Sequence, residues 1–363
     1  MRCESSAGTR ETFPQPSPLT PHTTIRAQRA LIVAPSWIGD TIMAQPLFAR
    51  LLAKSPGLQL DALSPRWVAP VLQRMAEIHD VIDSPFAHGQ LSLKARWRLA
   101  RQLAARRYDA VYVLPNSLKS ALVPFIAGIP QRIGFTGESR YGLINVRHTL
   151  DKQALPLMVE RFAQLAEAPG TPLPRPVSYP KIRSTAEEQQ KTLAELGIPR
   201  PAKVVAFCPG AEYGPAKRWP AAHFAELARK LAADGYAVWL FGSPKDSAVA
   251  EEILSLAPGL CRNLCGATSL GQAVDLLALT DLIVCNDSGL MHVAAALDRP
   301  IVALYGSSSP GFTPPLSDRA DILSLKLDCS PCFKRQCPLG HLDCLNKLSP
   351  QQVYAACRQR IAA

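Results

Sequence analysis

Short apolar segments alternate with longer amphipathic segments along most of this chain, and the alternation occurs in two series. The first series of predicted strands and helices covers residues 30–34, 41–54, 58–63, 67–75, a strand near 81, 93–106, 110–114 and 132–135. The second covers residues 203–207, 221–234, 237–241, 247–257, 281–285, 291–297 and 301–305. Alternating strands and helices form a parallel sheet with helices on both faces. The chain is therefore predicted to be an α/β protein with two such sheets.

A proline-rich stretch separates the two series. Residues 169–180 contain five prolines and are typical of a linker. We therefore expect two doubly wound, Rossmann-like domains facing across a cleft, one over residues 29–175 and one over 176–363. The segment beginning at residues 108–117 resembles the segment beginning at 280–288, which favours two similar halves.

Composition supports a globular chain of two domains. The chain has 363 residues, of which 47% are hydrophobic and 19% charged. No apolar run reaches the roughly 18 residues of a membrane helix. Residues 1–28 are rich in Pro, Thr, Ser and Arg and lack an apolar segment, so we expect a disordered tail and no secretory signal.

The net charge of +11 is unevenly distributed. Residues 1–175 hold 21 Lys and Arg against 12 Asp and Glu, a balance of +9, whereas residues 176–363 hold 19 against 17, a balance of +2. This excess indicates attraction to an acidic partner such as an anionic membrane or a phosphorylated lipid, with a merely soluble basic surface as the alternative. No dense Lys/Arg run or nucleic-acid motif is present, so nucleic acid is not expected as a partner.

Four of the ten cysteines lie close together near the C-terminus. Cys329, Cys332, Cys337 and Cys344 form a C-x2-C-x4-C-x6-C pattern. This spacing could bind a structural zinc, and a disulfide or unpaired loop thiols are the alternatives. Because the chain shows no export signal, reduced thiols are expected.

Residues 281–310 carry the most informative polar pattern, because a buried strand leads through a polar turn into a helix, a second strand and a Gly/Ser loop. A helix N-terminus carries unpaired N–H groups and suits a phosphate. In an open parallel sheet, ligands bind beyond the carboxyl ends of the strands. The sequence therefore predicts a phosphate site at Asp287, Ser288, Gly289 and His292. A purely structural turn is the alternative, and His292 either donates to phosphate or packs.

Two further loops carry charged side chains at strand ends. Asp40 follows the first strand and is predicted to act as a general base, with helix capping as its alternative role. Lys217 and Arg218 follow the strand at 203–207 and are predicted to neutralise a phosphate leaving group, with solvated loop charges as the alternative. A base in one domain and a diphosphate grip in the other describe an inverting, metal-independent glycosyl transfer.

Several well-known motifs are absent. Residues 210–218 resemble a Walker A loop, but Lys217 is not followed by Ser or Thr. Neither domain opens on G-x-G-x-x-G, and D-x-D, H-E-x-x-H and G-x-S-x-G do not occur. These absences argue against nicotinamide chemistry, P-loop hydrolysis, zinc hydrolysis, a serine nucleophile and a carboxylate-held magnesium ion.

Five segments together resemble glycosyltransferase family 9, namely residues 34–40, 112–124, 155–161, 208–220 and 286–315. The similarity extends over residues 30–360. It implies a GT-B fold and transfer of L-glycero-D-manno-heptose from ADP-heptose to the first heptose of the Kdo2-lipid A inner core. The alternatives are a sister transferase for the first or third heptose, or a nucleotide-sugar epimerase or hydrolase of the same fold.

The resemblance also implies roles for individual residues. It makes Asp40 the base and Lys217 the phosphate lysine. The ADP-sugar site would comprise Ser36, Lys217, Arg218, Asp287, Ser288, Gly289, His292, Gly306, Ser307 and Ser308. For the acceptor our candidates in the N-terminal domain are Asn116, Lys119, Arg132 and Arg140. No cofactor is expected for catalysis, and the cysteine segment is not expected to be catalytic.

One position departs from the family pattern, because Gly242 is not followed two residues later by the acidic residue expected to bind ribose. The implied acceptor is an acidic lipid at the cytoplasmic face of the inner membrane. We therefore expect a cytoplasmic protein that is held peripherally on that face by charge.

Overall fold

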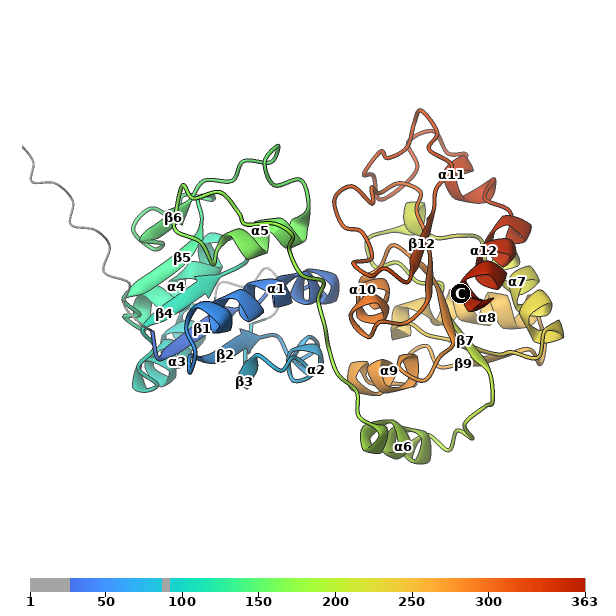
Figure 1. Ribbon diagram of the computed structural model, residues 1–363, viewed down its shortest axis with the longest axis horizontal. Coiled ribbons are helices and arrows are strands. Elements are labelled where there is room, and N and C mark those ends of the chain that lie inside the picture. The colour runs from blue at the N-terminus through green and yellow to red at the C-terminus, as the bar shows by residue number, and fades with distance from the viewer. Residues whose placement is uncertain (1–26, 87–91, 363) are drawn as a thin grey trace, which may run out of the picture.

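The computed structural model describes residues 27–86 and 92–362. The predicted tail lies outside the described residues except for its last two positions. Ala27 packs against the core, and the Gln28 amide donates to Asp109 Oδ2 at 2.7 Å. The ordered fold therefore includes these two residues ahead of the first strand. Two lobes make up the molecule, each built on its own sheet (Figure 1).

The first lobe contains a six-stranded parallel sheet with the order β3-β2-β1-β4-β5-β6. Its strands are β1 (Arg29–Val33), β2 (Gln59–Ser64), β3 (Ile78–Asp83), β4 (Ala110–Val113), β5 (Gln131–Phe135) and β6 (Val146–His148). Its helices are α1 (Ile38–Lys54), α2 (Ala69–Leu72), α3 (Leu93–Ala105), α4 (Leu118–Ile126) and α5 (Met158–Gln164).

The second lobe repeats this plan with the order β12-β11-β10-β7-β8-β9, again all parallel. The strands are β7 (Val204–Cys208), β8 (Ala237–Leu240), β9 (Cys261–Asn263), β10 (Leu282–Asn286), β11 (Ile301–Leu304) and β12 (Ala320–Leu323). The helices are α6 (Ala186–Glu195), α7 (Ala221–Ala233), α8 (Ser247–Leu256), α9 (Leu270–Leu277), α10 (Gly289–Ala296), α11 (Asp343–Asn346) and α12 (Pro350–Ala362), with 3-10 turns η1 (Pro215–Lys217) and η2 (Pro244–Asp246).

Counted within its own series, each sheet has the strand order 3-2-1-4-5-6. This is a doubly wound order in which the winding reverses between the first and fourth strands. β4 and β10 occupy the same place in the two sheets, which agrees with the sequence echo between residues 108–117 and 280–288. The predicted α/β class with two doubly wound sheets is confirmed.

Burial explains why the central strands were predictable. In β7 and β10 every residue is buried, and in β1 only Arg29 is partly exposed. Alternate side chains of β1 enter opposite layers: Leu31 packs with α3 and α4, whereas Ile32 packs with α1. Such strands must be continuously apolar because both faces of the sheet are covered.

The two lobes touch through the first turns of α1 and α10 (Figure 1). A Cβ placed on Gly39 would lie 2.7 Å from His292 Cδ2, and one on Gly289 would lie 3.1 Å from Ile38 Cβ. Below 3.0 Å real Cβ atoms find no room, so Gly39 is required for this close approach. α10 therefore packs with its N-terminus directly against the start of α1.

A second contact between the lobes is ionic. Arg74, which follows α2, places Nη2 2.8 Å from Asp275 Oδ1 in α9 and Nη1 2.9 Å from Glu188 Oε2 in α6. Arg74 and Asp275 are both largely shielded, with side chains only 11% and 5% exposed. The Met158 amide also donates to the Phe312 carbonyl at 3.0 Å. The lobes are thus joined on both sides of the α1–α10 contact.

Candidate active site

A cavity of about 970 Å³ lies at the carboxyl edge of the first sheet. It is lined by the connections after β1, β2 and β4 and by part of α5, and Ser36, Asp40, Asn116 and Lys119 are among the lining residues. The connections after β1 and β4 flank the point where the winding reverses, which is where open α/β sheets bind ligands. Four of the predicted site residues therefore share one cavity.

Asp40 is the only carboxylate of the first helical turn of α1, and it lines the cavity. The helix begins at Ile38, three residues earlier than predicted, so Asp40 belongs to the helix and not to the preceding loop. Burial raises the pKa of Asp40 to about 6, and the charge of Lys217 lowers that pKa only in part. A carboxylate with a pKa close to neutrality can accept a proton during a reaction.

Lys217 ends the turn η1 and reaches across to the start of α10. Its Nζ lies 2.5 Å from Asp287 Oδ2, and both side chains are largely buried, at 17% and 5% exposure. Lys217 also influences the pKa of Asp40 in the opposite lobe. The structure therefore brings together the predicted base, the predicted phosphate lysine and Asp287, although they are far apart in sequence.

His292 occupies the contact between the lobes. It is 4% exposed and packs over Gly39, and burial lowers its pKa to about 4. The ring is therefore neutral at ordinary pH and carries no charge for a phosphate. The contact with Gly39 shows that His292 packs, and its neutral ring keeps one N–H that can donate to a phosphate, so the donor role stays a prediction. Ser288 is the N-cap of α10, but its side chain makes no capping hydrogen bond.

The loop at Gly306 to Ser308 follows β11, beside α10. Ser307 and Ser308 are 2% and 7% exposed, and the hydroxyl oxygens of both are buried without a hydrogen-bond partner within the described part of the chain. Buried hydroxyl groups are normally hydrogen-bonded, so an unpaired pair next to a helix N-terminus is consistent with a ligand that supplies oxygen atoms.

An acidic residue that the sequence analysis did not assign lies beside Arg218. Asp246 accepts from the Ser243 amide and hydroxyl, both at 2.9 Å, and its Oδ1 lies 3.8 Å from Arg218 Nη2. A Cβ on Gly210 would lie 2.3 Å from Asp246 Oδ1, so the carboxylate sits against the chain that follows β7. The residue lies four positions after Gly242, which is why a search two positions after that glycine misses it.

Two of the four acceptor candidates do not line the cavity. The Arg132 guanidinium donates to the Leu143, Ile129 and Gly142 carbonyls. Arg140, which is 3% exposed, donates to the Pro115 carbonyl and to Asn116 Oδ1 at 2.9 and 3.0 Å. The Nη atoms of both arginines and Nε of Arg132 donate to the protein itself, whereas Nε of Arg140 is buried without a partner. Neither arginine is therefore placed to contact the acceptor in the cavity directly. Arg140 instead positions Asn116.

Two other arginines line the cavity and were not among the candidates. Arg96 lies on the buried side of α3, and its Nη1 donates to the Lys119 carbonyl at 2.8 Å. Arg161 of α5 donates through Nε to the Leu155 carbonyl at 3.0 Å and stacks over Phe312 of the second lobe. A charged residue at a buried helix position was a signal for Arg96, and Arg161 ends one of the segments that carried the resemblance.

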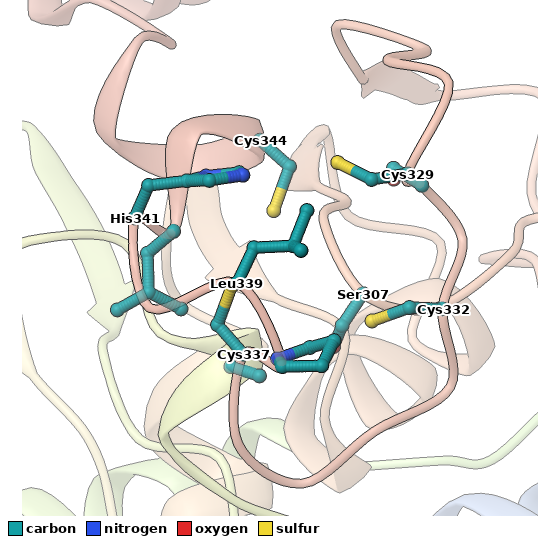
Figure 2. A pocket seen from close by; sticks show the side chains of 11 residues that line it. Ser307, Cys329, Cys332, Cys337, Leu339, His341 and Cys344 are labelled. Atoms are coloured by element: carbon teal, nitrogen blue, oxygen red, sulfur yellow. The ribbon is translucent and has the colours of Figure 1, made fainter.

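The four clustered cysteines line one small cavity of about 20 Å³, together with Ser307, Leu339 and His341 (Figure 2). All nine cysteines in the described residues are free thiols. Within residues 27–86 and 92–362, no group of three or more His, Cys, Asp or Glu side chains is arranged so that it could hold a metal ion. The geometry therefore supports neither the structural zinc nor the disulfide that the spacing allowed.

The cysteine segment nevertheless contacts the predicted donor loops. The Phe333 amide donates to the Ser307 carbonyl at 2.7 Å, and the Ala216 amide donates to the Arg335 carbonyl at 3.1 Å. A Cβ on Gly214 would lie 2.5 Å from the same Arg335 carbonyl oxygen, at a φ of +157°. The cysteine segment is thus hydrogen-bonded through its backbone to both the turn that carries Lys217 and the Gly/Ser loop.

Comparison with known proteins agrees with this arrangement. Residues 96–343 match the family described as Glycosyltransferase family 9 (heptosyltransferase). The chain is 47% identical over 334 residues to lipopolysaccharide heptosyltransferase 2 of Escherichia coli K12, covering 90% of this chain and 96% of the relative. It is 45% identical over 306 residues to lipooligosaccharide heptosyltransferase 2 of Haemophilus influenzae, covering 81% and 88%.

A solved structure of E. coli ADP-heptose LPS heptosyltransferase II superposes with a TM-score of 0.84 at 44% identity, covering 92% of this chain and 98% of that chain. The fold and the site define a sugar-nucleotide transferase with two doubly wound lobes, the GT-B arrangement. The chain belongs to glycosyltransferase family 9, the heptosyltransferases.

Proposed function

We propose that this chain transfers L-glycero-D-manno-heptose from ADP-heptose to the first heptose of the Kdo2-lipid A inner core. The observation that carries the proposal is that Asp40, which lines the cavity of the first lobe, lies near enough to Lys217 of the second lobe for the lysine charge to lower its pKa, although burial still raises that pKa to about 6. The names of the relatives at 45–47% identity support transfer of a heptose in lipopolysaccharide or lipooligosaccharide synthesis, and the name of the solved structure at 44% identity supports ADP-heptose as the donor.

The proposed reaction is an inverting displacement. Asp40 takes the proton of an acceptor hydroxyl, the oxygen of that hydroxyl forms a bond to the anomeric carbon, and the bond from that carbon to the diphosphate breaks. ADP leaves with the electron pair. Cationic side chains and aligned amides at a helix N-terminus stabilise such a leaving group without a divalent ion.

The donor site is assigned to the second lobe. Lys217, Arg218, Ser288, Gly289, Gly306, Ser307 and Ser308 surround the place proposed for the diphosphate. Asp287 holds Lys217 at 2.5 Å and is proposed to orient it, because a carboxylate would repel phosphate oxygens. Asp246 is the candidate for the ribose hydroxyls, and Ser36 remains a candidate for the donor sugar because it lines the cavity.

The acceptor site is assigned to the cavity of the first lobe. Asn116 and Lys119 remain the acceptor candidates from the sequence, and Arg96 and Arg161 join them because they line the same cavity. Guanidinium and ammonium groups suit an acceptor that carries phosphate or carboxylate groups. Among the described helices, none has the length and apolar character needed to cross a bilayer. We propose that the protein works at the cytoplasmic face of the inner membrane and is held there peripherally.

ADP release across a panel of truncated lipopolysaccharide acceptors tests this function. We expect release of ADP from ADP-heptose only when an acceptor ending in the first heptose is present. Asp40→Asn should lower kcat by about 100-fold or more while ADP still binds, because loss of general-base catalysis has effects of that order. Lys217→Ala should weaken both turnover and ADP binding.

A matched control is Lys245→Ala, because the Lys245 side chain is 74% exposed and forms an ion pair with Glu212 at the surface. That variant should keep wild-type turnover. Full turnover of Asp40→Asn would remove Asp40 as the base. ADP release without acceptor would favour a hydrolase or epimerase, and preference for another acceptor would favour a sister transferase for the first or third heptose.

A further inference from the structure

Several of the connections that leave the carboxyl edge of the first sheet carry exposed, large hydrophobic side chains. Trp67 follows β2 and is 51% exposed, Trp97 in the helix after β3 is 58% exposed, and Tyr141 after β5 is 78% exposed. Because all strands of this sheet are parallel, these connections leave from one edge. That edge also carries the cavity assigned to the acceptor.

Helix α3 presents the most regular part of this surface. Leu93, Trp97 and Arg101 are spaced by four residues, so they lie along one side of the helix. Leu93 and Trp97 are each 58% exposed, and the Arg101 guanidinium carbon lies 5.7 Å from the centre of the Trp97 ring. Lys94 and Arg98 are exposed beside them, while Leu99 and Leu103 on the inner side are buried in the core.

The opposite, inner side of α3 reaches the cavity. Arg96, the neighbour of Trp97, lines the cavity, and its donation to the Lys119 carbonyl fastens α3 to α4. Leu118 at the start of α4 also lines the cavity and is 40% exposed. A surface that holds the outer side of α3 would therefore lie one helix away from the cavity proposed for the acceptor.

We propose that Leu93, Lys94, Trp97, Arg98 and Arg101 dock the protein onto a bilayer that contains anionic phospholipid. Residues 93–105 contain four Lys and Arg and no acidic residue, and residues 1–175 carry a balance of +9. Interfacial helices bind anionic bilayers by combining apolar side chains, tryptophan in particular, with lysine and arginine. Charge of one sign over the whole helix favours a lipid surface over a protein partner with mixed charges.

The proposal rests on the proposed function in one respect, because docking would bring the cavity to the plane in which a lipid-anchored sugar lies. The test therefore separates membrane binding from sugar transfer. Sedimentation with vesicles of phosphatidylethanolamine and phosphatidylglycerol measures binding, and ADP release with a deacylated, water-soluble acceptor measures transfer. Vesicles of phosphatidylcholine alone show how far binding depends on anionic lipid.

We expect the wild type to bind the anionic vesicles in a salt-sensitive manner and to bind phosphatidylcholine weakly. The double variant Leu93→Ser, Trp97→Ser should lose about tenfold or more in vesicle affinity, because two apolar side chains no longer enter the interface. Lys94→Ser, Arg98→Ser should also bind more weakly and with a smaller salt dependence. Both variants should keep wild-type transfer to the soluble acceptor.

The matched control is Phe125→Ser, Ile126→Ser, which removes exposed apolar side chains (47% and 38%) from the far end of α4. It should bind vesicles like the wild type. Equal vesicle binding by the α3 variants and the wild type would overturn the proposal, as would wild-type protein that fails to bind anionic vesicles. A folded α3 variant that loses transfer to the soluble acceptor would place these residues in the acceptor site instead. Vesicle binding without any transfer would contradict the proposed function and leave docking intact.

Discussion

At the scale of single residues, the buried carboxyl of Asp40 is the most informative group. A carboxylate loses hydration when it is buried, so its protonated form is favoured and its pKa rises. Lys217 opposes this rise but does not cancel it. A proton acceptor with such a pKa is largely ionised at pH 7 and is still a stronger base than an exposed aspartate.

The first residue-scale prediction concerns the pH dependence of transfer. Because the base must be ionised, kcat/KM should fall about tenfold per pH unit below the pKa of about 6 and be independent of this group above it. The measurement is the initial rate of ADP release from pH 4.5 to 8. Lys245→Ala should show the same profile as the wild type. A rate that does not change between pH 5 and 8 would contradict the assignment of Asp40.

Residue types alone could make Asp40, Lys217, Asp287 and the Gly/Ser loop candidates, because these groups follow apolar strands and are too polar for simple turns. They could not show that most donors of Arg132 and Arg140 are used by backbone carbonyls, since those contacts depend on how β5 and the connection that follows it fold back. For the same reason Asp246 was missed: its position beside Gly210 is a contact between two separate connections.

At the scale of elements, the start of α1 shows why the sequence analysis misplaced the beginning of this helix. The predicted helix began at residue 41, because Gly39 is a poor helix former and follows a proline-containing loop. The helix in fact starts at Ile38. Glycine is needed at position 39, within the helix, because His292 leaves no room for a side chain there. A contact with a distant element thus overrides the local preference.

The element-scale prediction is that Gly39→Ala separates α1 from α10. The new methyl group would lie 2.7 Å from His292 Cδ2, so the helices must move apart or the ring must rotate. We expect a loss of about 1–3 kcal/mol in the free energy of unfolding, as for overpacked cores, and a fall in kcat. Urea unfolding and ADP release measure the two effects.

Gly271→Ala is the matched control for that change. Its Cβ would meet nothing closer than Pro70 Cβ at 3.8 Å, and the residue lies inside helix α9. It should therefore leave stability unchanged or raise it by up to about 1 kcal/mol, as expected for alanine in place of glycine in a helix. If both substitutions had the same effect, the α1–α10 contact would not be the cause.

Several strands and helices of the structure could not be predicted from the sequence pattern. β6 and β9 are three-residue edge strands with the sequences Val-Arg-His and Cys-Arg-Asn, which lack an apolar run. The helices α5, α6, α9 and α12 and the edge strand β12 were not predicted either. Central strands are buried on both faces and must be apolar, whereas the edge strands β6, β9 and β12 are partly exposed and need not be.

At the scale of the whole molecule, Arg74 joins the lobes through Asp275 and Glu188. Asp275 also accepts from Ser184 Oγ and Thr192 Oγ1, so its carboxylate is fully enclosed in polar contacts. This cluster holds α2 of the first lobe against α9 of the second. It keeps the edge that carries Asp40 opposite the edge that carries Lys217.

We predict that Arg74→Ala weakens the coupling of the lobes. Removing the guanidinium leaves a carboxylate that is 5% exposed without its cation, which costs about 3 kcal/mol in comparable buried pairs. Calorimetry should show a lower unfolding temperature, and kcat should fall because the base and the phosphate grip are no longer held opposite each other. Lys191→Ala, which removes an exposed pair with Glu195, should change stability by less than about 0.5 kcal/mol. Unchanged stability of Arg74→Ala would show that this cluster does not hold the lobes.

The lack of a side chain at Gly39, where α1 meets α10, has a practical consequence. Two helices meet there with only a hydrogen atom on one side, and the proposed reaction uses groups from both lobes. We expect a small compound that binds between α1 and α10 and separates them by the width of one methyl group to inhibit the enzyme, because it would hold the two lobes apart. Such an inhibitor would need to resemble neither the nucleotide nor the sugar.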